Sequence, residues 1–193
     1  MAVKGSSSAL ADSEELRCAP FANAQGKQNV SYNERRMKES FRSRMMRWAF
    51  NFFPAFRGTG GRVTYIASDW SEVRIKVPLN WRTRNYVGTI YGGSMYGAVD
   101  PFYMVMLIKR LGPEYIVWDK AATVRFKKPG RGTLTAQFLV QVEELRAIER
   151  ALANGAASVD RVYQVDLADA AGAVVATVEK VVYIRRKDAP ARN

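Results

Sequence analysis

One stretch of this 193-residue sequence constrains its fold more than any other. Residues 94–111 are apolar nearly all round a helical wheel, and the stretch closes with two cations before Gly112, which is typical of a helix end. A helix without a polar face has to be buried. Because Asp100 and Pro101 interrupt the stretch, it is marginal for crossing a bilayer, and we predict a core helix with a kink at Pro101.

Segments with the alternation of β-strands lie on both sides of this helix. Two short ones, separated by a polar turn, form a predicted hairpin at residues 63–67 and 73–77. Four more strands are expected at about residues 115–127, 133–140, 161–167 and 173–184, with a helix at 143–153 between the second and third of them. This order predicts an α+β fold in which an antiparallel sheet of about six strands wraps a long central helix.

The chain is long enough for one domain with an extension. We predict a mobile N-terminal arm at residues 1–30, a basic amphipathic helix at 31–57, the α+β domain at 62–187 and a tail at 188–193. The start has no apolar run of the signal-peptide type, so we expect a cytoplasmic protein. The single cysteine, Cys18, excludes an intramolecular disulfide and suits a reducing compartment.

The basic helix carries an apolar stripe in which residues recur every three or four positions. Its members are Met37, Phe41, Met45, Trp48 and Phe52. Such a helix either binds a membrane surface or a partner, or packs on its own domain. We favour packing, and we expect Pro54 and the glycine-rich residues 58–61 to end the helix and form a linker.

The amino-acid composition limits the partners and the kinds of reaction that this chain can have. An excess of basic residues gives a net charge of +12, which favours an anionic partner such as nucleic acid, an acidic membrane surface or a phosphate-bearing molecule like coenzyme A. The charge is spread along the chain without a nucleic-acid motif, which argues against nucleic acid. The chain has no histidine, which excludes Ser-His-Asp and Cys-His nucleophilic pairs and histidine metal sites. We expect no metal, and any reaction must use carboxylates, lysines, hydroxyls and backbone dipoles.

Three residues near the start of the central helix are candidates for a site. Gly92 and Gly93 would allow a ligand to approach unpaired N–H groups at a helix start, where developing negative charge would be stabilised. Asp100 follows Gly93 by seven residues, so it lies on the same face of the helix but about 10 Å further along the helix axis. An antiparallel partner helix could bring its own Asp100 opposite this Gly93, so a two-fold dimer is expected. The alternatives are a capping role for Asp100 and close packing for the glycines.

The spacing of these residues resembles the pattern of the PaaI-like branch of hot-dog thioesterases. In this chain Asn85 is followed after five residues by Tyr91-Gly92-Gly93, and Asp100 follows after six more. That family has histidine where this chain has Tyr91. The resemblance implies a hot-dog fold and an acyl-CoA thioesterase that works as a homodimer or a tetramer. Asp100 would be its base or nucleophile and Gly93 its oxyanion donor. Asn85 would orient a water or the loop backbone; the alternative is a purely local, turn-forming asparagine. No cofactor is implied beyond the coenzyme A of the substrate.

Further residues are expected to contact the substrate. Within the motif these are Tyr91, Gly92 and Thr89; outside it they are Lys120, Lys127 and Lys128. Lys120 shares a period-two face with apolar neighbours, so we predict that it points inward and approaches Asp100 within or across the dimer. The two other lysines lie in a turn that could meet the phosphates of coenzyme A, or could be an ordinary solvated turn. The second functional hypothesis is a non-catalytic protein that binds acyl or CoA-like ligands, or that associates with a membrane surface.

Overall fold

The computed structural model describes residues 38–188. In chain order its elements are helices α2 (Phe41–Phe52) and α3 (Pro54–Gly58), strands β1 (Arg62–Ile66) and β2 (Glu72–Val77), helices α4 (Gly92–Val99) and α5 (Phe102–Leu111), strands β3 (Tyr115–Phe126) and β4 (Leu134–Leu139), helix α6 (Val142–Ala153), and strands β5 (Val159–Ala168) and β6 (Val174–Arg186). The predicted order of strands and helices is confirmed. The predicted arm at 1–30, residues 31–37 of the predicted basic helix and residues 189–193 of the tail lie outside the described residues. Residues 38–40 are not helical, so the basic helix begins at Phe41, where Ser40 caps it, and not before.

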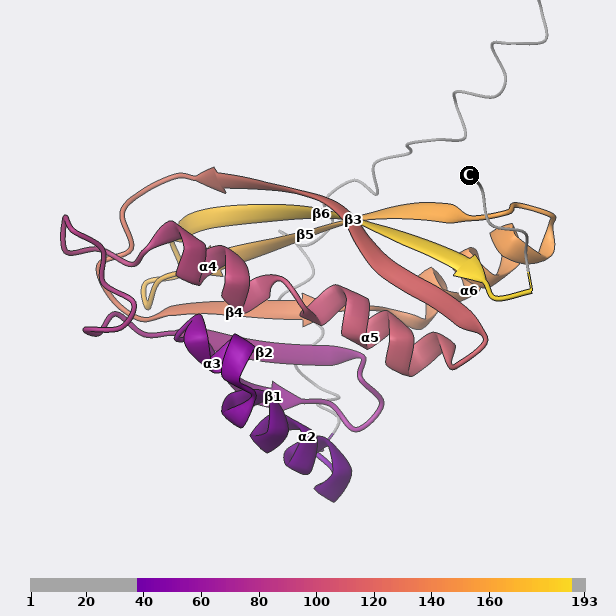
Figure 1. Ribbon diagram of the computed structural model, residues 1–193, viewed down its shortest axis with the longest axis horizontal. Helices are drawn as coiled ribbons and strands as arrows, with labels where there is room; N and C mark the ends of the chain where they lie inside the picture. Colours follow the sequence, from indigo (N-terminus) through magenta and orange to yellow (C-terminus); the bar gives the residue numbers. More distant parts are fainter. Residues whose placement is uncertain (1–37, 189–193) are drawn as a thin grey trace, which may run out of the picture. The chain divides into compact units, whose positions relative to one another are not determined.

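Within this range the strands form one antiparallel six-stranded sheet in the order β1-β2-β4-β5-β6-β3. In Figure 1, α4 and α5 lie end to end, with β3, β5 and β6 on one side of them and β1 and β2 on the other. The sheet therefore wraps the central helices, and the predicted hot-dog fold is confirmed. The strand order leaves β1 and β3 as the two edges of the sheet.

The central helix is broken where Asp100 precedes Pro101. Helix α4 ends with Asp100 as its C-cap, with φ −49° and ψ −50°, and α5 begins after Pro101. Proline has no N–H to donate and its ring crowds the preceding turn, so the predicted kink is found as a break between two helices. No helix within residues 38–188 has both the length and the apolar character needed to cross a membrane.

Aromatic side chains fix the start of α5 in the core. Phe102 has no exposed surface, and its ring centroid lies 5.0 Å from that of Phe138 on β4 and 5.6 Å from that of Phe50 on α2. The neighbouring Tyr103 is also buried and donates its hydroxyl to a backbone carbonyl of β5 at 2.9 Å. The beginning of α5 is therefore held between the sheet and the N-terminal helices.

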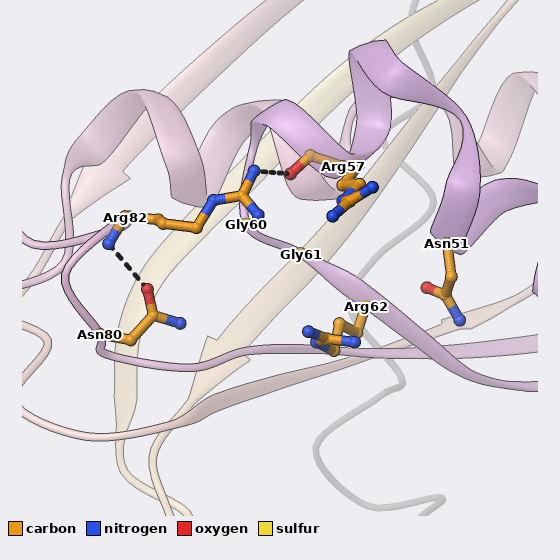
Figure 2. A pocket seen from close by; sticks show the side chains of 7 residues that line it. All are labelled: Asn51, Arg57, Gly60, Gly61, Arg62, Asn80 and Arg82. Atoms are coloured by element: carbon orange, nitrogen blue, oxygen red, sulfur yellow. Dashed lines mark hydrogen bonds between the residues drawn. The ribbon is translucent and has the colours of Figure 1, made fainter.

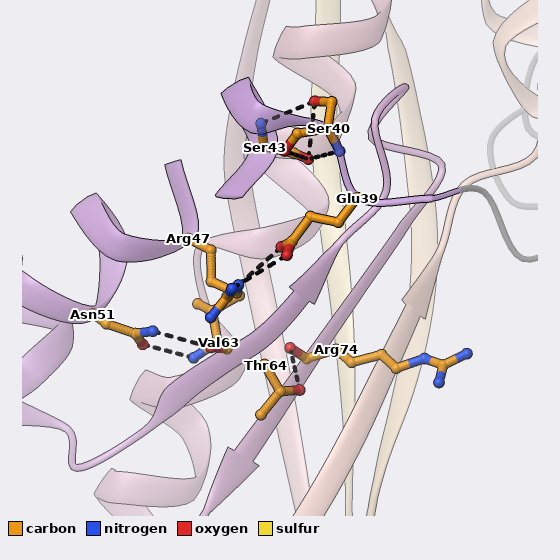
Figure 3. A network of polar contacts seen from close by, with 8 residues as sticks. All are labelled: Glu39, Ser40, Ser43, Arg47, Asn51, Val63, Thr64 and Arg74. Carbon is orange, nitrogen blue, oxygen red and sulfur yellow. Dashed lines mark hydrogen bonds and ion pairs between the residues drawn. The ribbon is translucent and has the colours of Figure 1, made fainter. Parts of the chain in front are cut away.

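Polar contacts attach α2 to the edge strand β1 (Figure 3). Ser40 and Ser43 form a capping box that starts the helix. Near the other end, the amide of Asn51 accepts from the N–H of Val63 at 2.8 Å and donates to its carbonyl at 3.0 Å. Asn51 thus satisfies backbone groups of an edge strand that would otherwise face solvent.

The apolar stripe predicted for this helix is its exposed side. The helix does pack on its own domain, but Met46 and Phe50 make the contact with the core. The described members of the stripe are between 56 and 69% exposed; they are Phe41, Met45, Trp48 and Phe52. Pro54 starts the short helix α3 instead of a linker, because proline is well suited to the first turn of a helix, where its missing N–H is not needed.

Candidate functional site

The carboxylate of Asp100 lies at the junction of α4 and α5 and is bound by a lysine of β6. Lys180 Nζ lies 2.8 Å from Asp100 Oδ1, and it also donates to the Asp100 backbone carbonyl. The side chain of Lys180 is 0% exposed, whereas that of Asp100 is 42% exposed. The site therefore presents a carboxylate that is held on its buried side and can be reached from solvent.

A second carboxylate shares the same lysine. Asp119 of β3 places Oδ2 2.6 Å from Lys180 Nζ, and its Oδ1 is buried without a hydrogen-bond partner among the described residues. Burial raises the pKa of Asp119; the charge of Asp100 also raises it, while Lys180 acts in the opposite direction. Two carboxylates thus share one buried ammonium group.

Tyr96 of α4 forms a hydrogen bond with the carboxylate of Asp100. Burial, followed by the hydrogen bond and charge of Asp100, raises the pKa of Tyr96 to about 12. The phenol is therefore protonated at neutral pH, and it can donate a hydrogen bond to Asp100 but cannot serve as a base. We call Tyr96, Asp100, Asp119 and Lys180 the Asp100 cluster.

The sequence contains a signal that points to Lys180 as an inward-facing lysine. Lys180 lies in a period-two series on β6 whose other members are buried and apolar; they are Ala176, Val178, Val182 and Ile184. A lysine in such a series is expected to point inward and to need an acid. The prediction that Lys120 does so is wrong within the chain: Lys120 Nζ binds Asp160 at 2.6 Å, and its side chain is 55% exposed.

A β-bulge in β3 explains the error. The pairing of β3 with β6 shifts between Asp119 and Ala121, so that Lys120 is the extra residue. Before the bulge Asp119 lies opposite a buried residue of β6, and after it Ala122 lies opposite Lys180. The extra residue changes which positions of β3 face the core, so one period-two pattern cannot describe the whole strand.

Gly92 and Gly93 begin α4, as predicted. The first hydrogen bond of the helix runs from the N–H of Ser94 to the Tyr91 carbonyl at 3.0 Å, so the two glycine amides have no acceptor within the helix. A Cβ at Gly92 would lie 2.8 Å from the ring of Phe126, and one at Gly93 would lie 2.4 Å from the ring of Tyr91. A side chain at either position would therefore require an exposed aromatic ring to move, and the amides are suited to an oxyanion.

The loop before α4 is organised by Asn85. Its Oδ1 accepts from the N–H groups of Val87 at 3.1 Å and Thr89 at 2.9 Å, and its Nδ2 donates to Thr89 Oγ1 at 2.9 Å. Gly88 completes the turn with φ +81°, a value that favours glycine. These contacts support the interpretation of Asn85 as a turn-forming residue. Tyr91, at the end of the loop, is 59% exposed.

The basic turn between β3 and β4 lies beside this loop. The N–H of Ile90 donates to the carbonyl of Gly130 at 2.9 Å, which joins the two segments. Lys128 Nζ is paired with Asp169 at 2.7 Å. Lys127 is exposed and forms no ion pair with any residue in the described range. The structure thus places the basic turn next to the loop that leads to α4, and Lys127 is the lysine of this turn that is free to bind a ligand.

Residues 42–184 match the model of a family described as "Domain of unknown function (DUF4442)". The chain belongs to this family. The matched residues contain the whole Asp100 cluster and extend from α2 almost to the end of β6. No curated protein has a sequence that matches this DUF4442 chain.

Several solved structures share the fold. The protein of unknown function PA5026 from Pseudomonas aeruginosa, described as a probable thioesterase, is 20% identical and has a TM-score of 0.65; the match covers 78% of this chain and 98% of that one. Thioesterase HI1161 from Haemophilus influenzae is 13% identical with a TM-score of 0.57, and the match covers 78% of this chain and 94% of that one. Protein OLEI01261 of unknown function from Chlorobaculum tepidum is 14% identical with a TM-score of 0.59, covering 75% and 94%. At these identities the likeness establishes the hot-dog fold.

Proposed function

We propose that this DUF4442 protein hydrolyses acyl-CoA thioesters, with Asp100 as base or nucleophile and the first amides of α4 as oxyanion donors. The observation that carries the proposal is the Asp100–Lys180 pair. A half-exposed carboxylate, held by a fully buried cation at a break between two helices, is arranged for a reaction partner on its open side. The fold shared with proteins that bear the name thioesterase supports the same class of reaction.

The reaction consumes one water. As a base, Asp100 takes a proton from water while the water oxygen adds to the thioester carbonyl; the C–S bond then breaks, and the sulfur leaves with a proton as free coenzyme A. As a nucleophile, Asp100 itself displaces the thiolate, and water then hydrolyses the resulting anhydride. In both routes the carbonyl oxygen gains negative charge, which the amide of Gly93 would stabilise.

The site needs two subunits in this proposal. Gly93 lies in the first turn of α4 and Asp100 caps its other end, so the two lie about 10 Å apart along one helix axis. In a two-fold dimer, antiparallel central helices would place Asp100 of one subunit near Gly93 of the other. The strand order supports such a dimer, because β3 is twelve residues long and stands at the edge of the sheet, where it can pair with a second copy.

The basic turn would bind the coenzyme A end of the substrate. It adjoins the loop that leads to α4, and Lys127 is exposed there without an ion pair in the described part of the chain. A phosphate bound by Lys127 would direct the pantetheine arm along the loop towards Tyr91 and Gly92. Thr89, which is 7% exposed, supports this loop through Asn85 and is a less suitable substrate contact than Tyr91.

One observation favours a second candidate, a non-catalytic protein that binds acyl-CoA. The ring of Tyr91 packs against Gly93, where it would compete with a carbonyl for space. A phenol also cannot replace imidazole as a base near neutral pH.

Two measurements separate these functions. Hydrolysis of acyl-CoA chains from acetyl to palmitoyl, followed by release of free thiol, tests turnover. Calorimetric titration with a non-hydrolysable thioether analogue tests binding alone. Turnover supports the thioesterase, binding without turnover supports the second candidate, and the lack of both contradicts the two proposals together.

A further inference from the structure

Helix α2 exposes more apolar surface than a water-facing helix normally does. The exposed stripe continues beyond the helix into Phe53, which is 58% exposed. The rings of Trp48 and Phe52 stack on each other with centroids 5.7 Å apart, so they form one continuous apolar surface. Contiguous exposed apolar side chains on a protein surface mark a binding face for a membrane or another protein.

The surroundings of this stripe are strongly basic. Residues 41–62 contain five arginines and no acidic residue. Arg47 pairs with Glu39 at 2.8 Å, but Arg57 and Arg62 have no carboxylate partner within residues 38–188. The stripe therefore lies within a field that attracts anions.

Two adjoining hollows connect the apolar stripe with these arginines. The larger one, of about 240 Å³, is lined by Trp48 and Phe52 together with Arg57 and Arg62. The smaller one, of about 80 Å³, shares both arginines and adds Arg82 (Figure 2). We call Arg57, Arg62 and Arg82 the arginine pocket.

The loop that carries Arg82 is held in place by close packing. A Cβ at Gly60 would lie only 2.1 Å from Thr83 Cγ2, so the turn after α3 and this loop touch. Thr83 is buried and donates its hydroxyl to the carbonyl of Pro78 at 2.6 Å, and Arg82 donates to the carbonyl of Arg57 at 3.2 Å. The pocket is therefore built by the fold, with three guanidinium groups and no acid among its lining residues.

We propose that α2 is an interfacial anchor for an anionic phospholipid surface. The apolar stripe enters the boundary between headgroups and acyl chains, and the arginine pocket binds a lipid phosphate beside it. Arginine is suited to bidentate recognition of phosphate, and a helix with a large apolar face bordered by cations is typical of interfacial binding. Trp81, which is 87% exposed next to Arg82, is of the residue type that prefers the membrane–water interface.

Charge decides between a lipid surface and a second copy of this chain. A second copy would bring another basic α2 against this one, and the like charges would repel. An anionic lipid surface pairs with both the apolar and the basic part of the face.

Vesicle flotation of the full chain tests the proposal. We expect binding to phosphatidylcholine vesicles that contain phosphatidylglycerol, and much weaker binding to phosphatidylcholine alone. A Trp48→Ser/Phe52→Ser variant should lose binding to both. The variants R57Q, R62Q and R82Q should each weaken binding to the anionic vesicles roughly fivefold, the effect expected for one cation near the surface.

Matched controls lie on α6. The variants V142S and R146Q/R150Q change an exposed apolar residue and two exposed arginines there, and they should leave flotation unchanged. Soluble glycerol phosphate can compete for the arginine pocket, but it should not release the protein completely, because it cannot engage the apolar stripe. Equal binding by the stripe variant, complete displacement by glycerol phosphate, or a stripe variant that instead dissociates a protein oligomer in sedimentation would each overturn the proposal.

Discussion

Lys180 and Asp100 are eighty residues apart in the sequence, yet Lys180 Nζ lies 2.8 Å from Asp100 Oδ1. The pair joins the buried strand β6 to the break between α4 and α5. It also places a cation between two acids, since Asp119 lies 2.6 Å from the same Nζ. The properties of the Asp100 cluster follow from this shared lysine.

Replacing Lys180 with methionine should destabilise the fold. The change leaves Asp100 and Asp119 close together without their cation, and breaking a buried pair usually costs more than 3 kcal/mol. Because both acids are partly exposed, we expect a loss of about 2 kcal/mol in the free energy of unfolding, measured by urea denaturation. The matched control is Lys120→Met, whose exposed ion pair with Asp160 should contribute less than about 1 kcal/mol. Equal effects of the two substitutions would contradict the assignment of Lys180.

Asp119→Asn should change how stability depends on pH. The native pKa of Asp119 is raised above the 3.8 of the unfolded chain. At pH values between these two pKa values, the native state therefore binds more protons than the unfolded state does. The Asp119 contribution to stability is therefore greatest at acid pH and is lost as pH rises through the raised pKa.

The asparagine variant lacks this titration. The melting temperature of the variant minus that of the wild type should therefore increase from pH 4 towards pH 7, as measured by calorimetry. A difference that stays constant with pH, or that decreases, would show that the native pKa of Asp119 is not raised.

Gly93→Ala should act through Tyr91. The added methyl group would lie 2.4 Å from Tyr91 Cε1, so the ring must move. Because the ring is 59% exposed and can move towards solvent, we expect a loss of less than about 1 kcal/mol in the free energy of unfolding. Tyr91→Ala should restore most of it, because the ring that clashes is then absent. A double-mutant cycle measures the coupling, and additive effects of the two substitutions would contradict the packing of Tyr91 on Gly93.

The fold could be predicted because its pattern is local and repeated. The apolar run at residues 94–111 required a buried helix, and the alternating segments on both sides required a sheet to cover it. Pro101 predicted the kink from its missing N–H alone. The face by which α2 packs could not be predicted in this way, because Met46 and Phe50 are fewer than the exposed apolar residues on the opposite side.

The candidate site was only partly predictable. The spacing from Asn85 to Asp100 indicated the loop and helix start that the structure contains. Lys120 was predicted as the partner of Asp100, because an extra bulged residue cannot be recognised from the alternation of apolar and polar residues. Lys180 lies between the buried Val178 and Val182 in a period-two series on β6, so the same reasoning applied to that strand points to it.

The central claim is tested most directly by the hydrolysis of acyl-CoA by the wild type and Asp100→Asn, with Asp160→Asn as a control for an exposed acid outside the cluster. Asparagine keeps the shape of the side chain but can neither take a proton nor attack a carbonyl. We predict that kcat falls about a hundredfold or more in Asp100→Asn and stays unchanged in Asp160→Asn, with both variants folded. Turnover by Asp100→Asn at the wild-type rate would contradict a catalytic role for Asp100.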